Sequence, residues 1–182
     1  TAWICRRIFR FKGMKEKRPF PSPLHLIFHL LAWLPLLWLL WGIWQGQLGL
    51  NPVRTVTLRT GKAALIFLLL SLTCTPLYLL FDWKWVYRFR RPLGLYAFLY
   101  AALHLLTFIG LDYAFDWVLV ADALQNNRYT LVGLVAFLIL LPLALTSTKR
   151  SQAWLGPQWW KWLHRWSYLA AVLALLHYAL LV

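Results

Sequence analysis

Long apolar segments alternate with short polar segments along this chain of 182 residues. Five of the apolar segments are long enough to cross the hydrocarbon core of a bilayer, which takes about 20 residues of helix. These segments cover residues 24–45, 61–81, 93–112, 129–147 and 163–182. A backbone in lipid must satisfy its own hydrogen bonds. The pattern therefore predicts an all-α, polytopic transmembrane bundle of about five helices.

The composition supports a membrane protein and excludes an ordinary soluble domain. Hydrophobic residues make up 62% of the chain and charged residues 13%, whereas soluble domains are about half apolar and about a quarter charged. Many of the 13 Trp residues lie at the ends of the apolar segments, for example Trp44, Trp83 and Trp160. Tryptophan is typical of both membrane–water interfaces.

The net charge of +14 comes from basic residues clustered in short stretches between the apolar segments. Fifteen of the 19 Lys and Arg residues fall before the first segment, between the second and third, or around the start of the fifth. The positive-inside rule places these stretches in the cytoplasm, facing anionic lipid. We therefore expect a basic cytoplasmic N-terminal segment over residues 1–23, an external C-terminus, membrane lipid as a partner and no nucleic-acid partner.

All five histidines lie in the apolar segments or at their ends: His25, His29, His104, His164 and His177. Ionisable residues inside a membrane are costly, and each is a candidate functional residue. No Asp or Glu lies within these segments away from their ends, although a proton relay would be expected to combine His with a carboxylate. Neutral imidazoles in apolar surroundings instead favour axial ligation of haem iron.

Depth suggests how these histidines pair. His104 and His177 are expected about 18 Å and about 24 Å from the cytoplasmic ends of their helices, which suits one haem in the outer half. His29 and His164 lie near the cytoplasmic ends and suit an inner haem. However, 13 residues separate His164 from His177, which leaves them roughly 140° apart around a straight helix. Either the helix start is irregular or His164 has another role. For His25 we favour a helix–helix hydrogen bond.

Arginines at the inner mouth have two interpretations. Arg91 and Arg165 either neutralise haem propionates or simply follow the positive-inside rule, and the second interpretation is the more economical one. The loops between the apolar segments are too short to form a separate NAD(P)H- or flavin-binding domain. The chain is therefore expected to be an electron-transfer subunit rather than the catalytic subunit of an oxidoreductase.

A resemblance to a known family is clearest in residues 90–113, which read RRPLGLYAFLYAALHLLTFIGLDY. This stretch resembles the MsrQ (YedZ) family, the haem-binding membrane subunits of the periplasmic methionine-sulfoxide reductase system, within the wider ferric-reductase-like transmembrane group. Further segments match in the family's order: GLNPV at 49–53, RTGKAAL at 59–65, LALTST at 143–148 and WLHRWSYLAAVLALLHY at 162–178. The resemblance covers nearly the whole chain from about His25.

The resemblance implies a ferric-reductase-like haem domain over residues 24–182 and a b-type cytochrome of the bacterial inner membrane, with one or two haems. The family's ligand histidines match His104, His164 and His177, and its first-span histidine matches His29. Electrons would come from the quinone pool or a cytoplasmic flavin donor, and FMN is associated with family members. They would pass to a periplasmic molybdopterin-dependent methionine-sulfoxide reductase.

Two alternatives to this function stay open at the level of the sequence. One is a haem subunit of another ferric-reductase-like electron-transfer system. The other is a haem-free scaffold subunit of a larger membrane complex, which would need none of the histidines as ligands. The presence or absence of a haem b absorption spectrum in the purified protein separates the scaffold from both cytochromes.

Overall fold

A computed structural model of the protein describes residues 23–181, and every long element within this range is helical. The basic segment predicted over 1–23 lies outside the described residues, apart from Pro23. The chain forms two compact units, residues 1–34 and residues 35–182. The boundary falls at Pro35, inside helix α2 (Pro23–Trp44). Each unit is described by itself.

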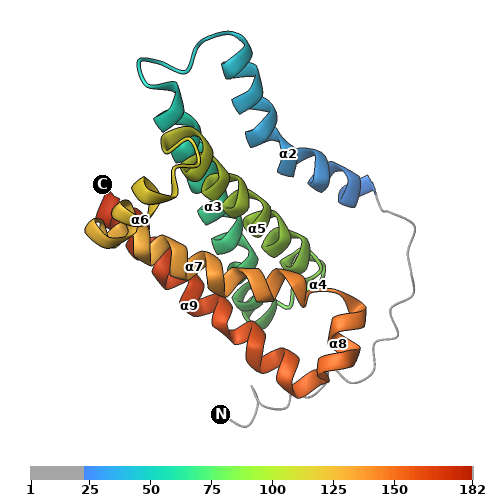
Figure 1. Ribbon diagram of the computed structural model, residues 1–182. Helices are drawn as coiled ribbons and strands as arrows, with labels where there is room; N and C mark the ends of the chain where they lie inside the picture. Colours follow the sequence, from blue (N-terminus) through green and yellow to red (C-terminus); the bar gives the residue numbers. More distant parts are fainter. Residues whose placement is uncertain (1–22, 182) are drawn as a thin grey trace. The chain divides into compact units, whose positions relative to one another are not determined.

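The second unit holds four long helices and the end of α2 (Figure 1). The long helices correspond to the last four predicted apolar segments: α3 (Pro52–Phe81), α5 (Arg90–Thr107), α7 (Arg128–Leu145) and α9 (Pro157–Leu181). Short helices connect them: α4 (Lys84–Tyr87), α6 (Trp117–Asn126) and α8 (Lys149–Leu155). A π-helix, η2 (Phe108–Asp112), continues α5. The predicted all-α membrane bundle is confirmed.

Four helices among the described residues are long and apolar enough to cross a membrane: Leu26–Trp44, Pro52–Phe81, Lys84–Asp112 with its short break, and Arg128–Leu145. Helix α9 is the exception. Its 25 residues include His164, Arg165 and His177 as well as several Trp and Tyr residues, and these lower its mean hydropathy. Its role as a fifth span, and the side of the membrane on which each loop lies, stay predictions.

Local signals decide where these helices begin. Helix α3 starts at Pro52 rather than near residue 61, because Asn51 caps it by accepting a hydrogen bond from the backbone N–H of Arg54 at 3.0 Å. Proline suits the first turn of a helix, where its missing N–H costs nothing. Helix α9 similarly begins with Pro157, after Gly156 turns the chain at a φ of 75°.

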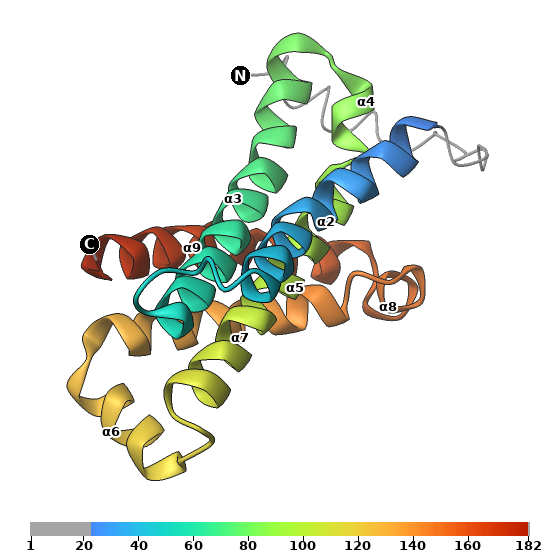
Figure 2. The same ribbon diagram turned by 90° about the horizontal axis from the view of Figure 1, so that it is seen from above.

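The long helices pack as two antiparallel hairpins, with α3 beside α5 and α7 beside α9 (Figures 1 and 2). Contacts of α5 with α7 and of α3 with α9 join the hairpins into one bundle. Small residues let the helices approach closely: Ala97 and Ala170 are fully buried. Such close approach is typical of helices that associate in lipid.

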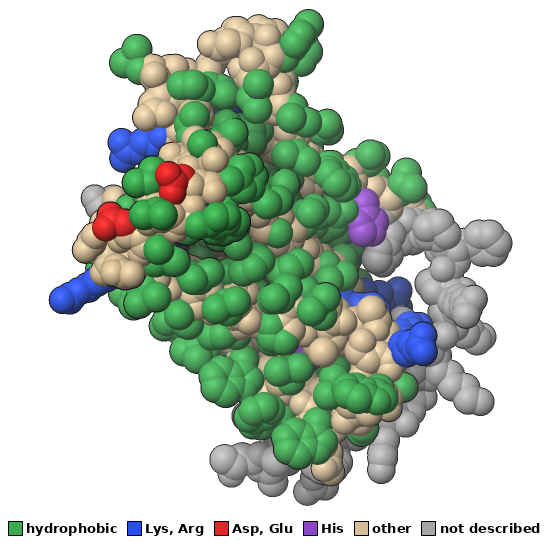
Figure 3. All heavy atoms as spheres, in the orientation of Figure 1, with side chains coloured by type: hydrophobic (Ala, Val, Ile, Leu, Met, Phe, Trp, Pro, Cys, Tyr) green, Lys and Arg blue, Asp and Glu red, His purple; other side chains and the backbone are tan. Residues whose placement is uncertain are grey.

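Large hydrophobic side chains cover the outside of the bundle, and Figure 3 shows them predominating on the face in view. Leu106, Leu138 and Val172 are each more than half exposed. Soluble monomers rarely expose continuous apolar surfaces, whereas lipid solvates them without cost. The exposed surface therefore agrees with the composition of the sequence and supports membrane embedding.

The up-and-down order of the helices gathers four helix ends at each end of the bundle. The start of α3, the end of η2, the start of α7 and the end of α9 share one end, which we call the pocket end. The connections at the opposite end carry a run of basic residues: Lys84, Arg88, Arg90, Arg91, Lys149, Arg150, Lys161 and Arg165. The two ends thus differ strongly in charge.

Candidate functional site

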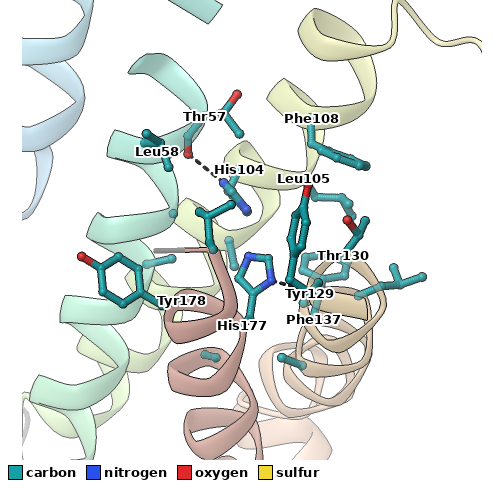
Figure 4. A pocket seen from close by; sticks show the side chains of 18 of the residues that line it. Thr57, Leu58, His104, Leu105, Phe108, Tyr129, Thr130, Phe137, His177 and Tyr178 are labelled. Atoms are coloured by element: carbon teal, nitrogen blue, oxygen red, sulfur yellow. Dashed lines mark hydrogen bonds between the residues drawn. The ribbon is translucent and has the colours of Figure 1, made fainter. Parts of the chain in front are cut away.

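A cavity of about 600 Å³ opens at the pocket end, between α3, α5, α7 and α9 (Figure 4). Its volume is that of a site for a cofactor-sized ligand. Side chains of α6 close part of its rim, among them Val120 and Leu124. Most of the lining is apolar, and both His104 and His177 belong to it.

His104 is held by helix α3. Its Nδ1 lies 2.8 Å from the backbone carbonyl oxygen of Thr57. A carbonyl oxygen only accepts hydrogen bonds, so Nδ1 must carry the ring proton. The other ring nitrogen, Nε2, is then unprotonated and has a free lone pair.

His177 is held by helix α7 in the same way. Its Nδ1 lies 2.6 Å from the backbone carbonyl oxygen of Tyr129. The same reasoning assigns the proton to Nδ1 and leaves Nε2 with its lone pair. Metal-binding histidines are commonly oriented by such a bond from the non-ligating nitrogen, which fixes both the tautomer and the direction of the ring.

The two imidazoles face each other across the cavity (Figure 4). Their ring centroids are 6.0 Å apart and their planes cross at 72°. A metal ion held between two imidazole nitrogens places the ring centroids about 6 Å apart, because each metal–nitrogen bond is about 2 Å long. The centroid spacing therefore matches that of two imidazoles that hold one metal ion.

The rest of the donor set points to a haem rather than a bare metal ion. Among the described residues, no group of three or more His, Cys, Asp or Glu could hold a metal by itself. Two imidazoles are sufficient only when a macrocycle supplies the other ligands. The large apolar lining suits a porphyrin face, and Arg54 and Lys62 at the cavity could pair with its carboxylates.

One buried hydroxyl in the cavity has no partner among the residues that the structure describes. Thr130 is 8% exposed, lines the cavity, and its Oγ1 makes no hydrogen bond to any of them. Buried polar groups are almost always paired. A ligand with a polar edge would satisfy this hydroxyl, and the propionate side of a haem offers such an edge.

The pocket end also carries acidic groups. Asp112 accepts a hydrogen bond from the hydroxyl of Thr57 at 3.1 Å, so the carboxylate is tied to the residue that holds His104. Next to it, burial raises the pKa of the Tyr113 phenol above its ordinary value, and Tyr129, Asp112 and Asp122 raise it further. The Tyr113 phenol is therefore neutral at physiological pH.

His164 does not reach this cavity. It lies near the start of α9, where its Nε2 is 3.3 Å from the hydroxyl oxygen of Thr146 and its ring lies 4.1 Å from that of Trp160. The Thr146 hydroxyl itself donates to the carbonyl of Pro142. The structure therefore brings together His104 and His177 but separates His164 from both.

The other candidate residues from the sequence are His25, His29, Arg91 and Arg165. His29 lies on α2 in the first unit, with its ring 5.4 Å from that of Phe28. His25 is also in α2, and its side chain lies outside the described residues. Arg91 and Arg165 are exposed at the end of the bundle opposite the cavity, and neither lines it. The pairing of His29 with His164 stays a prediction.

Several residues of the cavity were not singled out from the sequence. Arg54, Lys62 and Thr130 belong to this group, and so do two glycines that contact the histidine rings, Gly61 and Gly133. A glycine inside an apolar helix is a known signal of close approach. The hydroxyl and basic residues gave no such signal, since only the packing shows which of them face the cavity.

Comparison with known proteins agrees with this site. The family described as "ferric reductase like transmembrane component" matches residues 32–175 of the chain. No solved structure shows significant similarity to it.

Individual relatives have a common name, protein-methionine-sulfoxide reductase heme-binding subunit MsrQ. The one from Rhodospirillum rubrum is 47% identical, over 82% of this chain and 72% of that protein. The one from Herminiimonas arsenicoxydans is 45% identical, over 72% of this chain and 61% of that protein. The one from Caulobacter vibrioides is 38% identical, over 92% and 81% respectively.

Proposed function

The chain belongs to the ferric-reductase-like transmembrane family, and we propose that it is a haem-binding, electron-transfer membrane subunit of a methionine-sulfoxide reductase system. The names of its relatives state haem binding and this system for those proteins. One observation of this chain carries the proposal. His104 and His177 face each other across a cofactor-sized cavity, with both Nδ1 atoms bound to carbonyl oxygens.

The chain's own residues have distinct tasks in this proposal. His104 and His177 would hold the iron through Nε2, while the Thr57 and Tyr129 carbonyls keep their rings in place. Arg54 and Lys62 balance the charge of the propionates, and the apolar lining excludes water. A haem b held there supplies one-electron redox chemistry, with a potential set by these surroundings.

The electrons that pass through this chain would be used by a separate catalytic subunit. Reduction of one methionine sulfoxide to methionine and water takes two electrons and two protons, so each turnover needs two successive one-electron transfers. We assign that reaction to a periplasmic, molybdopterin-dependent catalytic subunit. The donor is the quinone pool of the bacterial inner membrane or, as the second candidate, a cytoplasmic flavin such as FMN.

A second, inner haem is part of the proposal, with His164 and His29 as its ligands and Arg91 and Arg165 beside its propionates. The position of His164 at the end of the bundle opposite the cavity supports a separate site. Ligation would require Nε2 to exchange the Thr146 hydroxyl for iron. A haem-to-protein ratio of two in the purified protein is the expected result.

The main test uses His104→Gly and His177→Gly, each purified with and without added imidazole. Removing either ring leaves a hole of imidazole shape beside the iron. We expect each variant to lose the low-spin absorption of the outer haem, with that of the inner haem retained, and millimolar imidazole to restore the outer signal. Leu106→Ala is the control, because this side chain is on α5 near His104 but 57% exposed on the outside.

Two results would contradict the ligand assignment. The first is an unchanged haem content and spectrum in both glycine variants. The second is a colourless wild-type protein after expression with sufficient haem, which would favour the haem-free scaffold. Rapid reduction of the haem by quinol in membranes, but not by reduced FMN, would identify the quinone pool as the donor; the reverse would identify the flavin.

A further inference from the structure

The two hairpins of the bundle hold their histidines in the same way. Nδ1 of His104 bonds to the carbonyl of Thr57, and the ring lies against Gly61, one helical turn further along α3. Nδ1 of His177 bonds to the carbonyl of Tyr129, and the ring lies against Gly133, again one turn further along α7. We call each combination of carbonyl and glycine a histidine seat.

Neither glycine of the seats leaves room for a side chain. A β-carbon built on Gly61 would lie 2.9 Å from Nδ1 and 3.0 Å from Cε1 of His104. A β-carbon built on Gly133 would lie 2.8 Å from both Nδ1 and Cε1 of His177. Real β-carbons essentially never approach other heavy atoms this closely. Any larger residue would push the imidazole out of its seat.

Ordinary helix packing does not account for these two positions. Glycine is a poor helix former, and alanine is the small residue that helices prefer. The bundle does use alanine where helices merely touch, as at Ala97 and Ala170. At Gly61 and Gly133, by contrast, a histidine ring lies directly against the backbone of the neighbouring helix.

We propose that Gly61 and Gly133 are positioning residues that fix the planes of His104 and His177 at their observed, nearly perpendicular angle. The carbonyl holds one edge of each ring and the glycine supports its face, so the ring cannot turn without breaking a hydrogen bond or a contact. This inference rests on the proposed function, because the crossed rings become the axial ligands of the haem. Crossed axial imidazoles give ferric haem a distinctive, strongly anisotropic low-spin EPR signal.

The test compares Gly61→Ala and Gly133→Ala with Gly94→Ala in the purified, haem-loaded protein. Gly94 is a matched control, since it is also in a long helix and its β-carbon would meet only Ser71 Oγ, at an ordinary 3.4 Å. We expect the wild type and Gly94→Ala to show the same anisotropic low-spin signal and the same reduction potential for the haem between His104 and His177. Gly61→Ala and Gly133→Ala should move the largest g value and shift the potential.

A second experiment separates positioning from general damage to the helix. The His104→Gly/Gly61→Ala double variant is loaded with haem in the presence of free imidazole, which is not attached to the backbone and can move away from the added methyl group. We expect it to show the same largest g value and reduction potential as His104→Gly with imidazole. The effect of Gly61→Ala should therefore appear only when His104 is present, which is a coupling that a double-mutant cycle measures.

Three results would overturn the positioning role. They are wild-type g values and potential in both seat variants, a parallel-ligand signal in the wild type, or a double variant whose g values and potential differ from those of His104→Gly with imidazole. Failure of the proposed function gives a different result. A wild-type protein that binds no haem would show no low-spin signal for any of these variants to change.

Discussion

At the scale of single residues, the two pocket histidines divide their ring nitrogens between two tasks. Nδ1 of each ring donates its proton to a backbone carbonyl, at 2.8 Å for His104 and 2.6 Å for His177. A backbone carbonyl only accepts hydrogen bonds, so it fixes the tautomer of the neutral ring. In that tautomer Nε2 carries the lone pair that a metal would bind, whereas a hydroxyl can donate or accept and fixes no tautomer.

Thr130→Val tests whether the cavity is built for a polar ligand group. The buried hydroxyl is unpaired within residues 23–181, and such a group costs about 1–3 kcal/mol. We expect valine to raise the stability of the haem-free protein by about 1 kcal/mol and to weaken haem binding severalfold. Thermal unfolding with and without haem measures both effects.

The opposite pattern in Thr130→Val would argue against this role. A lower stability of the haem-free variant would mean that the hydroxyl already has a partner. Unchanged haem affinity would mean that the hydroxyl faces no polar part of the ligand.

His164→Ala tests the inner haem. His164 lies near the start of α9, well apart from the cavity, so its removal should leave the outer haem in place. We expect the haem-to-protein ratio to fall from two to one, with the outer low-spin spectrum retained, as measured by pyridine haemochrome assay against protein concentration. An unchanged ratio would show that the protein holds its haem without His164.

At the scale of elements, the cavity depends on short helices as well as on long ones. Helix α6 lies across part of the cavity rim, and its residues Val120 and Ala123 are buried. Asp116 caps this helix by accepting hydrogen bonds from the N–H groups of Val118 and Leu119, at 2.9 and 3.2 Å. A helix of 10 residues is only marginally stable alone, so this cap and its packing hold it in place.

Asp116→Ala should loosen α6 selectively. Loss of an N-cap typically costs about 1 kcal/mol, and hydrogen exchange of the amides of Trp117–Asn126 should increase accordingly. Faster haem dissociation is expected to accompany it, because the rim opens more often. Asp122→Ala is the control, since it removes the same charge but only a side-chain bond to Asn126. Equal exchange rates in both variants would contradict the role of the cap.

At the scale of the whole molecule, the second unit combines an apolar outside, a cavity with two histidines at one end and basic connections at the other. The positive-inside rule assigns the basic end to the cytoplasm. The cavity would then open on the opposite side of the membrane, where a periplasmic catalytic subunit could receive its electrons. A haem held near this open end would keep the transfer distance to such a subunit short.

Cysteine labelling tests this orientation. In a variant with Cys5→Ser and Cys74→Ser, we expect a membrane-impermeant maleimide to label Gln125→Cys, on α6, in intact cells. Ala153→Cys, on α8, should be labelled only after the membrane is opened. Both positions are exposed in the structure. Labelling of Ala153→Cys in intact cells would reverse the predicted topology.

Much of this architecture follows from the sequence alone. Continuous apolar segments long enough to span a bilayer predict membrane helices, because lipid permits few other backbone conformations. The matched depth of His104 and His177 predicts that they meet, since depth along a helix depends only on counting residues. Helix ends were less predictable: α3 begins at Pro52, where a cap rather than hydropathy decides.

Only the tertiary structure shows how the histidines are held and what surrounds them. The sequence gives neither the Thr57 and Tyr129 carbonyls nor Gly61 and Gly133 as their seats, because these contacts depend on the rotation of each helix about its axis. The same is true of the separation of His164 from the cavity. Residue counting determines depth in the membrane, whereas the packing of neighbouring helices decides which side chains face one another.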